Sequence, residues 1–142
     1  MNYQEAAREL KGALRMRTEP LGVGFLSDAA SLPEKTRRPS QALGKRVTIC
    51  QGVTMARLYG WPVGLTPEDL ICVPGMLAFG LAPESDPGQE MARILCEVGF
   101  HQELDAAREE VEALTRFSPQ EIEALYLAPL ERLGLDPDVV VV

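Results

Sequence analysis

Apolar residues recur every three to four positions in several segments, a spacing typical of amphipathic helices. It predicts a helix over Tyr3–Met16, which Pro20 separates from the next element. It also predicts helices over residues 51–59, 87–98 and 104–114. The chain is therefore expected to be rich in short helices.

Other segments carry the apolar pattern of β-strands. Large apolar residues alternate with glycine in Leu21–Leu26, Leu125–Leu130 is almost continuously apolar, and Asp138–Val142 ends in four valines. A short β-prone run, Val47–Ile49, precedes the second predicted helix. Ser27–Gly44 shows neither period and is predicted to be a long surface loop.

Together these elements predict an α+β fold, with a small central sheet and helices packed on one face. A length of 142 residues is that of one domain, so we expect a single α+β domain over residues 1–142. Four valines on an open sheet edge would invite pairing, so a strand of this domain or of a second chain should cover them. The terminal strand therefore favours a homo-oligomer.

The charge distribution narrows the classes of partner. Net charge is −7, with ten Lys+Arg against seven Asp+Glu in residues 1–71, and four against fourteen in residues 72–142. The acidic half argues against nucleic acid, because an extended surface for it needs several basic side chains. The basic group within residues 35–46 is interpreted as a solvated loop, and Glu68–Asp69 as solvated charges of a first helical turn.

The sequence carries no sign of a membrane or export segment. No apolar run approaches the roughly 20 residues of a membrane-spanning helix, and the N-terminus lacks the apolar core of a secretory signal. We therefore expect a cytoplasmic protein without a membrane partner. Standard phosphate-binding, serine-hydrolase and zinc-protease motifs are absent from the sequence, and His101 is the only histidine.

The cysteines are the most informative chemical groups. Cys50 comes just before a predicted helix, whose N-terminal amides favour a thiolate suited to metal ligation or nucleophilic attack. Cys72 precedes the turn Val73–Gly75, which would hold its thiol in position, and Cys96 lies roughly opposite the apolar stripe of its helix. The three are candidate ligands of zinc or an iron–sulfur cluster. The alternative is that each is a small, buried and inert apolar residue.

Two further residues of the helix predicted at 51–59 complete the candidate site. Arg57 would supply a cation for an anionic small-molecule ligand. Gln51 directly follows Cys50 and is a candidate ligand contact.

Short motifs occur in a characteristic order along the chain. They are Cys50-Gln51, Ala56-Arg57 with Gly60, Glu68-Asp69, Cys72, Gly75, Gly80, Tyr126-x-x-Pro129-Leu130-Glu131 and Pro137-Asp138-Val139-Val140. In this order, from about Pro20 to Val142, the chain resembles the uncharacterised domain-of-unknown-function family 169 (DUF169).

The resemblance implies a bacterial or archaeal cytoplasmic protein, and the paired cysteines of that family suggest metal or iron–sulfur binding. Two departures from the family pattern matter. Members commonly have proline directly after the second cysteine, where this chain has Val73, and they continue beyond the Pro-Asp-Val strand. We therefore expect a shortened member, or half of a site completed elsewhere. The resemblance implies no role for Cys96.

Three functions are compatible with these features. The first is a cytoplasmic metal- or small-ligand-binding module that uses Cys50 and Cys72. The second is a cysteine-dependent enzyme or redox protein with Cys50 as nucleophile. The third is a non-catalytic subunit that assembles through its strand edge and acidic face. The first two require folding to bring two thiols to one accessible pocket.

Overall fold

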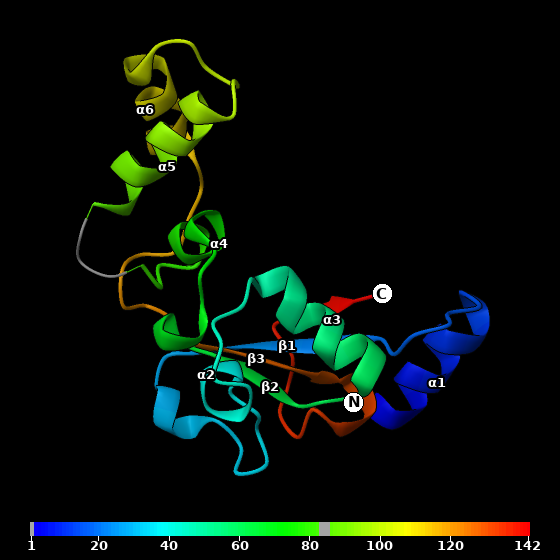
Figure 1. The fold of residues 1–142 in the computed structure, drawn as a ribbon. Coiled ribbons are helices and arrows are strands. Elements are labelled where there is room, and N and C mark those ends of the chain that lie inside the picture. The colour runs from blue at the N-terminus through cyan, green and yellow to red at the C-terminus, as the bar shows by residue number, and fades with distance from the viewer. Residues whose placement is uncertain (1, 83–85) are drawn as a thin grey trace.

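The computed structural model describes residues 2–82 and 86–142. Within them, six α-helices accompany a four-stranded antiparallel sheet (Figure 1). The helices are α1 (Tyr3–Ala13), α2 (Pro39–Ala42), α3 (Ile49–Tyr59), α4 (Val73–Ala78), α5 (Pro87–Glu97) and α6 (Leu104–Ala113). The strands are β1 (Leu21–Leu26), β2 (Val63–Leu65), β3 (Ala124–Pro129) and β4 (Val139–Val141). The predicted α+β class is confirmed.

The sheet has the order β2-β3-β1-β4, so segments from both ends of the chain form its centre. β1 and β3 pair along six residues, from Leu21 opposite Pro129 to Leu26 opposite Ala124. β4 adds to the free side of β1. The three predicted strands are confirmed. Each strand pair joins residues that are far apart in sequence, so the sheet forms only once the chain has collapsed.

Three local predictions need correction. Residues 27–44, predicted to be a loop throughout, contain the one-turn helix α2, which begins at Pro39. The pattern misses β2, because three residues with Gly64 at the centre show no usable alternation. Val47–Ile49 is not a strand of the sheet: Val47 forms a single parallel bridge with Leu70, and Thr48 caps α3. Thr48 accepts a hydrogen bond from the Gln51 amide, so the chain turns into a helix where a strand was expected.

The main core fills the face of the sheet that α3 covers, and Met76 of α4 adds to it. Leu21 of β1, Leu127 of β3 and Leu65 of β2 are buried there. α3 lies across the strands (Figure 1) and packs closely at Gly52. A Cβ at Gly52 would lie 2.8 Å from Cδ1 of Leu65, so glycine sets the distance between helix and sheet.

Loops and short 3₁₀ turns cover the opposite face. Three of its strand positions are glycines, next to larger residues such as Tyr126, and Gly22 shows the reason most clearly. A Cβ on Gly22 would lie 2.4 Å from Cδ2 of the buried Leu133, and one on Gly64 would lie 2.7 Å from Cγ2 of Thr36. The glycines that weaken the strand pattern therefore let irregular segments pack directly on the backbone.

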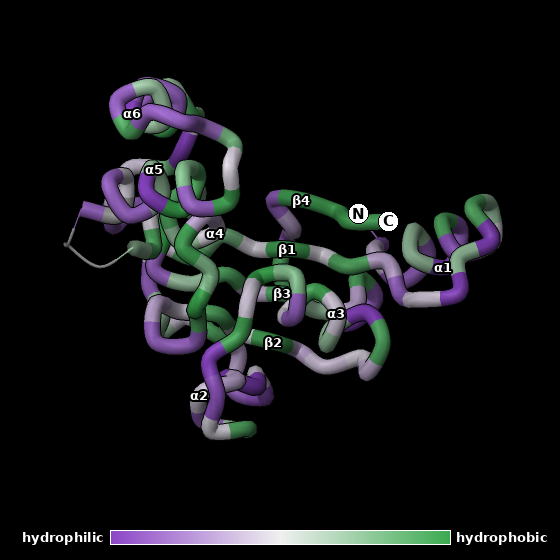
Figure 2. The backbone as a smooth tube through the Cα atoms, turned by 45° about the horizontal axis from the view of Figure 1, so that its top comes forward, coloured by the Kyte–Doolittle hydropathy of each residue, from purple (hydrophilic) through white to green (hydrophobic). Residues whose placement is uncertain are grey.

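A helical hairpin of α5 and α6 projects from the end of the sheet (Figure 1). α4 lies between this hairpin and the sheet. The hairpin's own small core contains Ala92, Ala107 and Val111, together with Leu77 of α4. Cys96 packs against this cluster, so the prediction that Cys96 lies opposite the apolar stripe is wrong. Along the hairpin, polar and apolar positions alternate, whereas β1 and β3 are mainly apolar (Figure 2).

Candidate functional site

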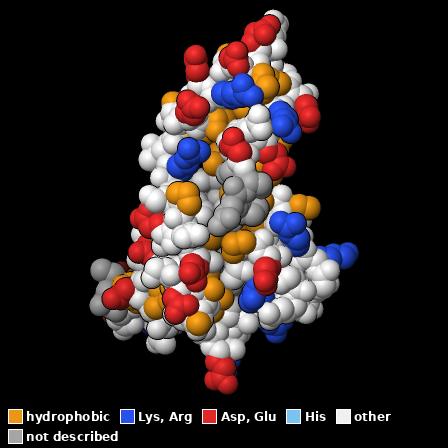
Figure 3. Space-filling model, turned by 90° about the vertical axis from the view of Figure 1, so that its left-hand side faces the viewer, with side chains coloured by type: hydrophobic (Ala, Val, Ile, Leu, Met, Phe, Trp, Pro, Cys, Tyr) orange, Lys and Arg blue, Asp and Glu red, His pale blue; other side chains and the backbone are white. Residues whose placement is uncertain are grey.

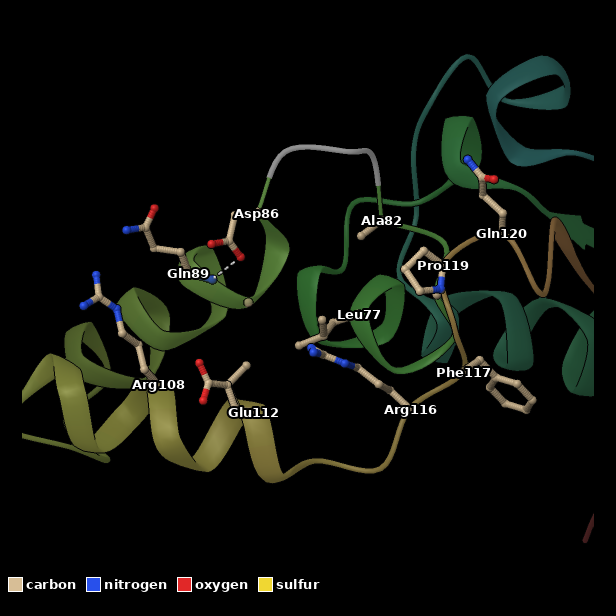
Figure 4. A pocket seen from close by; sticks show the side chains of 13 residues that line it. Leu77, Ala82, Asp86, Gln89, Arg108, Glu112, Arg116, Phe117, Pro119 and Gln120 are labelled. Carbon is tan, nitrogen blue, oxygen red and sulfur yellow. Dashed lines mark hydrogen bonds between the residues drawn. The ribbon is translucent and has the colours of Figure 1, made fainter.

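A cleft of about 510 Å³ lies where the α5–α6 hairpin meets α4 and the chain that returns to β3 (Figure 4). Leu77 of α4 and Val111 of α6 give it an apolar floor. Ala82 and Pro119 line the side nearer the sheet. This volume falls within the range of about 300–1,000 Å³ that is usual for small-molecule sites.

Aromatic packing holds the returning chain in place beside this cleft. The ring of Phe117 stacks on Phe79 at a centroid distance of 6.0 Å and meets the edge of Phe25 at 5.3 Å. The Phe117 amide also donates a hydrogen bond of 3.0 Å to the Ala78 carbonyl. One wall of the cleft is therefore anchored to both α4 and the sheet.

Side chains of both charges line the cleft. Asp86 caps α5 by accepting a hydrogen bond of 3.0 Å from the Gln89 amide, and Arg108 forms an exposed ion pair of 3.1 Å with Asp105. Within residues 2–82 and 86–142, no ion pair or side-chain hydrogen bond engages the other two charged groups, Glu112 and Arg116. Among the described residues, neither charge has a partner that a ligand would need to displace.

A second hollow of about 390 Å³ lies on the sheet side of the same returning chain. Arg38 and Glu68 line it and form an ion pair of 3.0 Å. Beneath them lies Asp69, which is fully buried and not solvated as the sequence suggested. Together, Arg38, Glu68 and Asp69 join the start of α2 to the 3₁₀ turn after β2.

Both oxygens of Asp69 are saturated with hydrogen bonds. Oδ1 accepts from the amide and hydroxyl of Ser40, at 3.0 and 2.6 Å. Oδ2 accepts from the amide and hydroxyl of Thr66 and from Nε of Arg38, at 2.9–3.0 Å. Burial raises the pKa of this carboxyl, but the hydrogen bonds outweigh burial and leave the pKa below its usual value. These hydrogen bonds therefore stabilise the packing of the two segments that meet at Asp69.

Folding brings the segments that carry Cys50 and Cys72 together. The Val47 amide donates to the Asp69 carbonyl at 2.7 Å, and the Ile71 amide donates to the Val47 carbonyl at 3.0 Å. α3 and α4 therefore begin beside each other, with an exposed Cys50 in the first turn of α3 and a half-buried Cys72 as the N-cap of α4.

The third cysteine does not join them. Cys96 is held in the hairpin core, and the residues the structure describes contain no group of three or more His, Cys, Asp or Glu side chains that could hold a metal ion. The predicted three-cysteine ligand set of Cys50, Cys72 and Cys96 is thus not formed. Spacing in the sequence says nothing about this, because the hairpin carries Cys96 away from the sheet.

The two predicted ligand contacts on α3 have structural partners. The Gln51 side chain accepts a hydrogen bond of 2.8 Å from the Thr48 amide and completes the capping box of α3. Arg57 donates to the Thr18 hydroxyl, at 3.1 and 2.8 Å. Arg57 also lies seven residues from Cys50, about 10 Å along the helix axis. It is therefore not part of the same immediate site.

The sequence reasoning missed the residues of the cleft. Glu112 and Arg116 are four residues apart, a spacing that by itself indicates an ion pair on one exposed helix face. Helical periodicity marks the apolar face of α6 but not the place where two elements leave a gap. The available signal was the end of the helical pattern at Leu114.

Charges on the end of the molecule that carries the hairpin are mixed. Figure 3 shows acidic and basic side chains interspersed there, without a continuous field of one sign. Within the described ranges, no helix has both the length and the apolar character required to cross a membrane.

Comparisons with known proteins identify a family but no characterised relative. No curated protein and no solved structure matches the chain. The sequence profile of DUF169, described as uncharacterised ArCR, matches residues 9–142. Since this covers nearly the whole chain, the protein belongs to the DUF169 family.

Proposed function

We propose that this protein is a small-molecule-binding module whose site is the cleft between α4, α5, α6 and the chain returning to β3. The observation that carries the proposal is the composition of that cleft. An apolar floor at Leu77 and Val111 adjoins charged side chains of both signs. Apolar walls with a few oriented polar groups are the usual construction of a ligand site.

The position of the cleft also supports the proposal. It lies at the junction of two cores, between elements that pack mainly through α4. Ligand pockets occur preferentially at such junctions, because two rigid units can leave a gap that neither fills. None of the three cysteines lines the cleft, so this function does not depend on thiol chemistry.

Ligand screening by NMR tests this proposal. Fragments should shift amide signals of Ala82, Gly88 and Val111, and the Ala82→Trp variant should lose this binding because indole fills the cleft. Ala78→Trp is the matched control, since Ala78 is exposed on α4 and does not line the cleft. The proposal fails if no fragment shifts these signals, or if Ala82→Trp binds as wild type does.

A second candidate function is favoured by the parallel bridge between Val47 and Leu70. This bridge places Cys50 and Cys72 at the starts of neighbouring helices, where the two thiols would supply part of a zinc or iron–sulfur site. The remaining ligands would come from a second chain.

Metal titration with serine variants tests the cysteine site. Zinc should bind the reduced protein at about one ion per site, and Cys50→Ser and Cys72→Ser should each reduce the bound zinc. Cys96→Ser is the control, because Cys96 is held in the hairpin core. Equal binding by all three variants, or colourless anaerobic protein that takes up neither zinc nor iron, removes this candidate.

A further inference from the structure

Glu112 and Arg116 lie in the same cleft without neutralising each other. On a continuous helix, residues four apart face one another and pair. α6 ends at Ala113, and Leu114 takes an extended conformation with ψ 130°. The break carries Arg116 off the helix axis, so that the two side chains reach the cleft from different segments.

The two charged ends are placed at separate points of the cleft. Figure 4 shows Glu112 rising from α6, and Arg116 extending from the returning chain toward Leu77. Nη1 of Arg116 lies 4.0 Å from the position of a Cβ on Gly88, at the start of α5. Since Glu112 and Arg116 form no ion pair with each other, they offer one negative and one positive anchor, beside Asp86, which caps α5, and Arg108, which pairs with Asp105.

We propose that the ligand of this cleft is a zwitterion of amino-acid type, with its carboxylate on Arg116, its ammonium group on Glu112 and an aliphatic side chain over Leu77 and Val111. This inference rests on the proposed function and names its ligand class. A planar guanidinium binds a carboxylate through two parallel hydrogen bonds, and a carboxylate accepts from an ammonium group.

The two opposite charges in the cleft also disfavour ligands that carry a charge of only one sign. A simple anion would leave the charge of Glu112 without a partner, and a simple cation would leave that of Arg116 without one. A zwitterion compensates both side chains at once. Two charged anchors beside an apolar floor recognise a short molecule with opposite charges at one end and a branched hydrocarbon at the other.

Leucine and two matched analogues test the inference. 4-Methylpentanoate lacks the amino group of leucine, and 3-methylbutylamine lacks its carboxylate. Calorimetric titration should show that wild type binds leucine at least about tenfold more tightly than either analogue, a factor worth about 1.4 kcal/mol. A single-charge analogue that binds as tightly as leucine overturns the inference.

Charge-neutral variants assign each end of the ligand. Arg116→Gln should weaken leucine and 4-methylpentanoate about tenfold and leave 3-methylbutylamine unchanged. Glu112→Gln should weaken leucine and 3-methylbutylamine and leave 4-methylpentanoate unchanged. Arg93→Gln and Glu109→Gln are the controls, because both residues are exposed on the same hairpin and do not line the cleft. Equal losses in the controls and the cleft variants would contradict the assignment.

The outcomes separate this inference from the proposed function. If fragments shift the cleft signals but leucine and the other amino acids do not bind, the ligand class is wrong and the binding function stands. If neither amino acids nor fragments bind in the cleft, both proposals fall.

Discussion

One buried carboxylate, Asp69, connects two loops that lie far apart in the sequence. Its oxygens accept from Ser40, Thr66 and Arg38, so its charge is balanced without water. Glu68 binds the same arginine, but its side chain is 79% exposed. Adjacent acids therefore differ in their expected contribution to stability.

Asp69→Asn should lower the free energy of unfolding by about 3 kcal/mol, because it leaves the mostly buried Arg38 with only the exposed Glu68 as its counter-ion. Glu68→Gln should cost no more than about 1 kcal/mol, since its pair is exposed and screened by solvent. Urea denaturation of both variants measures the difference. Equal losses would show that burial of Asp69 is not what matters.

The lowered pKa of Asp69 predicts a direction for acid stability. A carboxyl whose folded pKa lies below its unfolded value stabilises the fold fully above the unfolded value, about 3.9. This contribution is lost as the pH falls through the folded pKa. Stability of wild type should therefore drop below about pH 4, with a smaller drop for Asp69→Asn in thermal melts at pH 7 and pH 3. Parallel pH curves would contradict this assignment.

At the scale of elements, glycines in the strands decide how the second face of the sheet is covered. Gly22 lies under the buried Leu133, where a Cβ would meet Cδ2 at 2.4 Å. Gly12 in α1 has no heavy atom within 4 Å of such a Cβ. The same substitution should therefore have opposite effects at the two sites.

Gly22→Ala should destabilise the protein by about 1–3 kcal/mol through overpacking. Gly12→Ala should stabilise it by about 0.5–1 kcal/mol, because alanine favours a helix over glycine. Chemical denaturation measures both changes. If Gly22→Ala is neutral, Leu133 moves aside at little cost and the close packing does not constrain the sheet.

β4 is a second element whose surroundings affect how the protein assembles. It forms an edge of the sheet, and Val140 is 41% exposed. We expect a homo-oligomer in which a second copy covers this edge. Val140→Lys should then reduce the molar mass in light scattering, whereas Leu58→Lys, an exposed site on α3, should not. An unchanged mass for Val140→Lys removes this mode of assembly.

At the scale of the whole molecule, two cores meet at α4, and the proposed ligand site lies at their junction. Leu77 belongs to the hairpin core although its helix packs beside the sheet. Contacts between the hairpin and the rest run mainly through this helix. The hairpin is therefore expected to open more readily than the sheet.

Leu77→Ala should remove about 2–5 kcal/mol of packing at this junction. Hydrogen exchange should then accelerate in residues 87–113 while β1 and β3 keep their protection, because unfolding is local. Mass spectrometry of deuterated peptides measures this. Ala78→Gly, at an exposed position of the same helix, controls for a general weakening of α4. Equal acceleration in hairpin and sheet would show one cooperative unit.

Helices α1, α3, α5 and α6, three of the four strands and the family were open to prediction, because each depends on local periodicity or on motif order. The short helices α2 and α4 were not, because neither is long enough to show a helical period. Hydrophobic spacing records which side of a segment faces a core. This spacing identified α5, α6 and the valine-rich strand β4 from residues that are close together in sequence. The glycine pattern of Leu21–Leu26 also indicated a strand, although not the loops that require it.

Only the tertiary structure decided which segments meet. The burial of Asp69, the separation of Cys96 from Cys50 and Cys72, and the cleft all depend on contacts between residues far apart in sequence. β2 becomes a strand because β3 and Arg37 flank it, not because of its own pattern. Local preferences determine elements, whereas the packing of those elements determines what they bury and what gaps they leave.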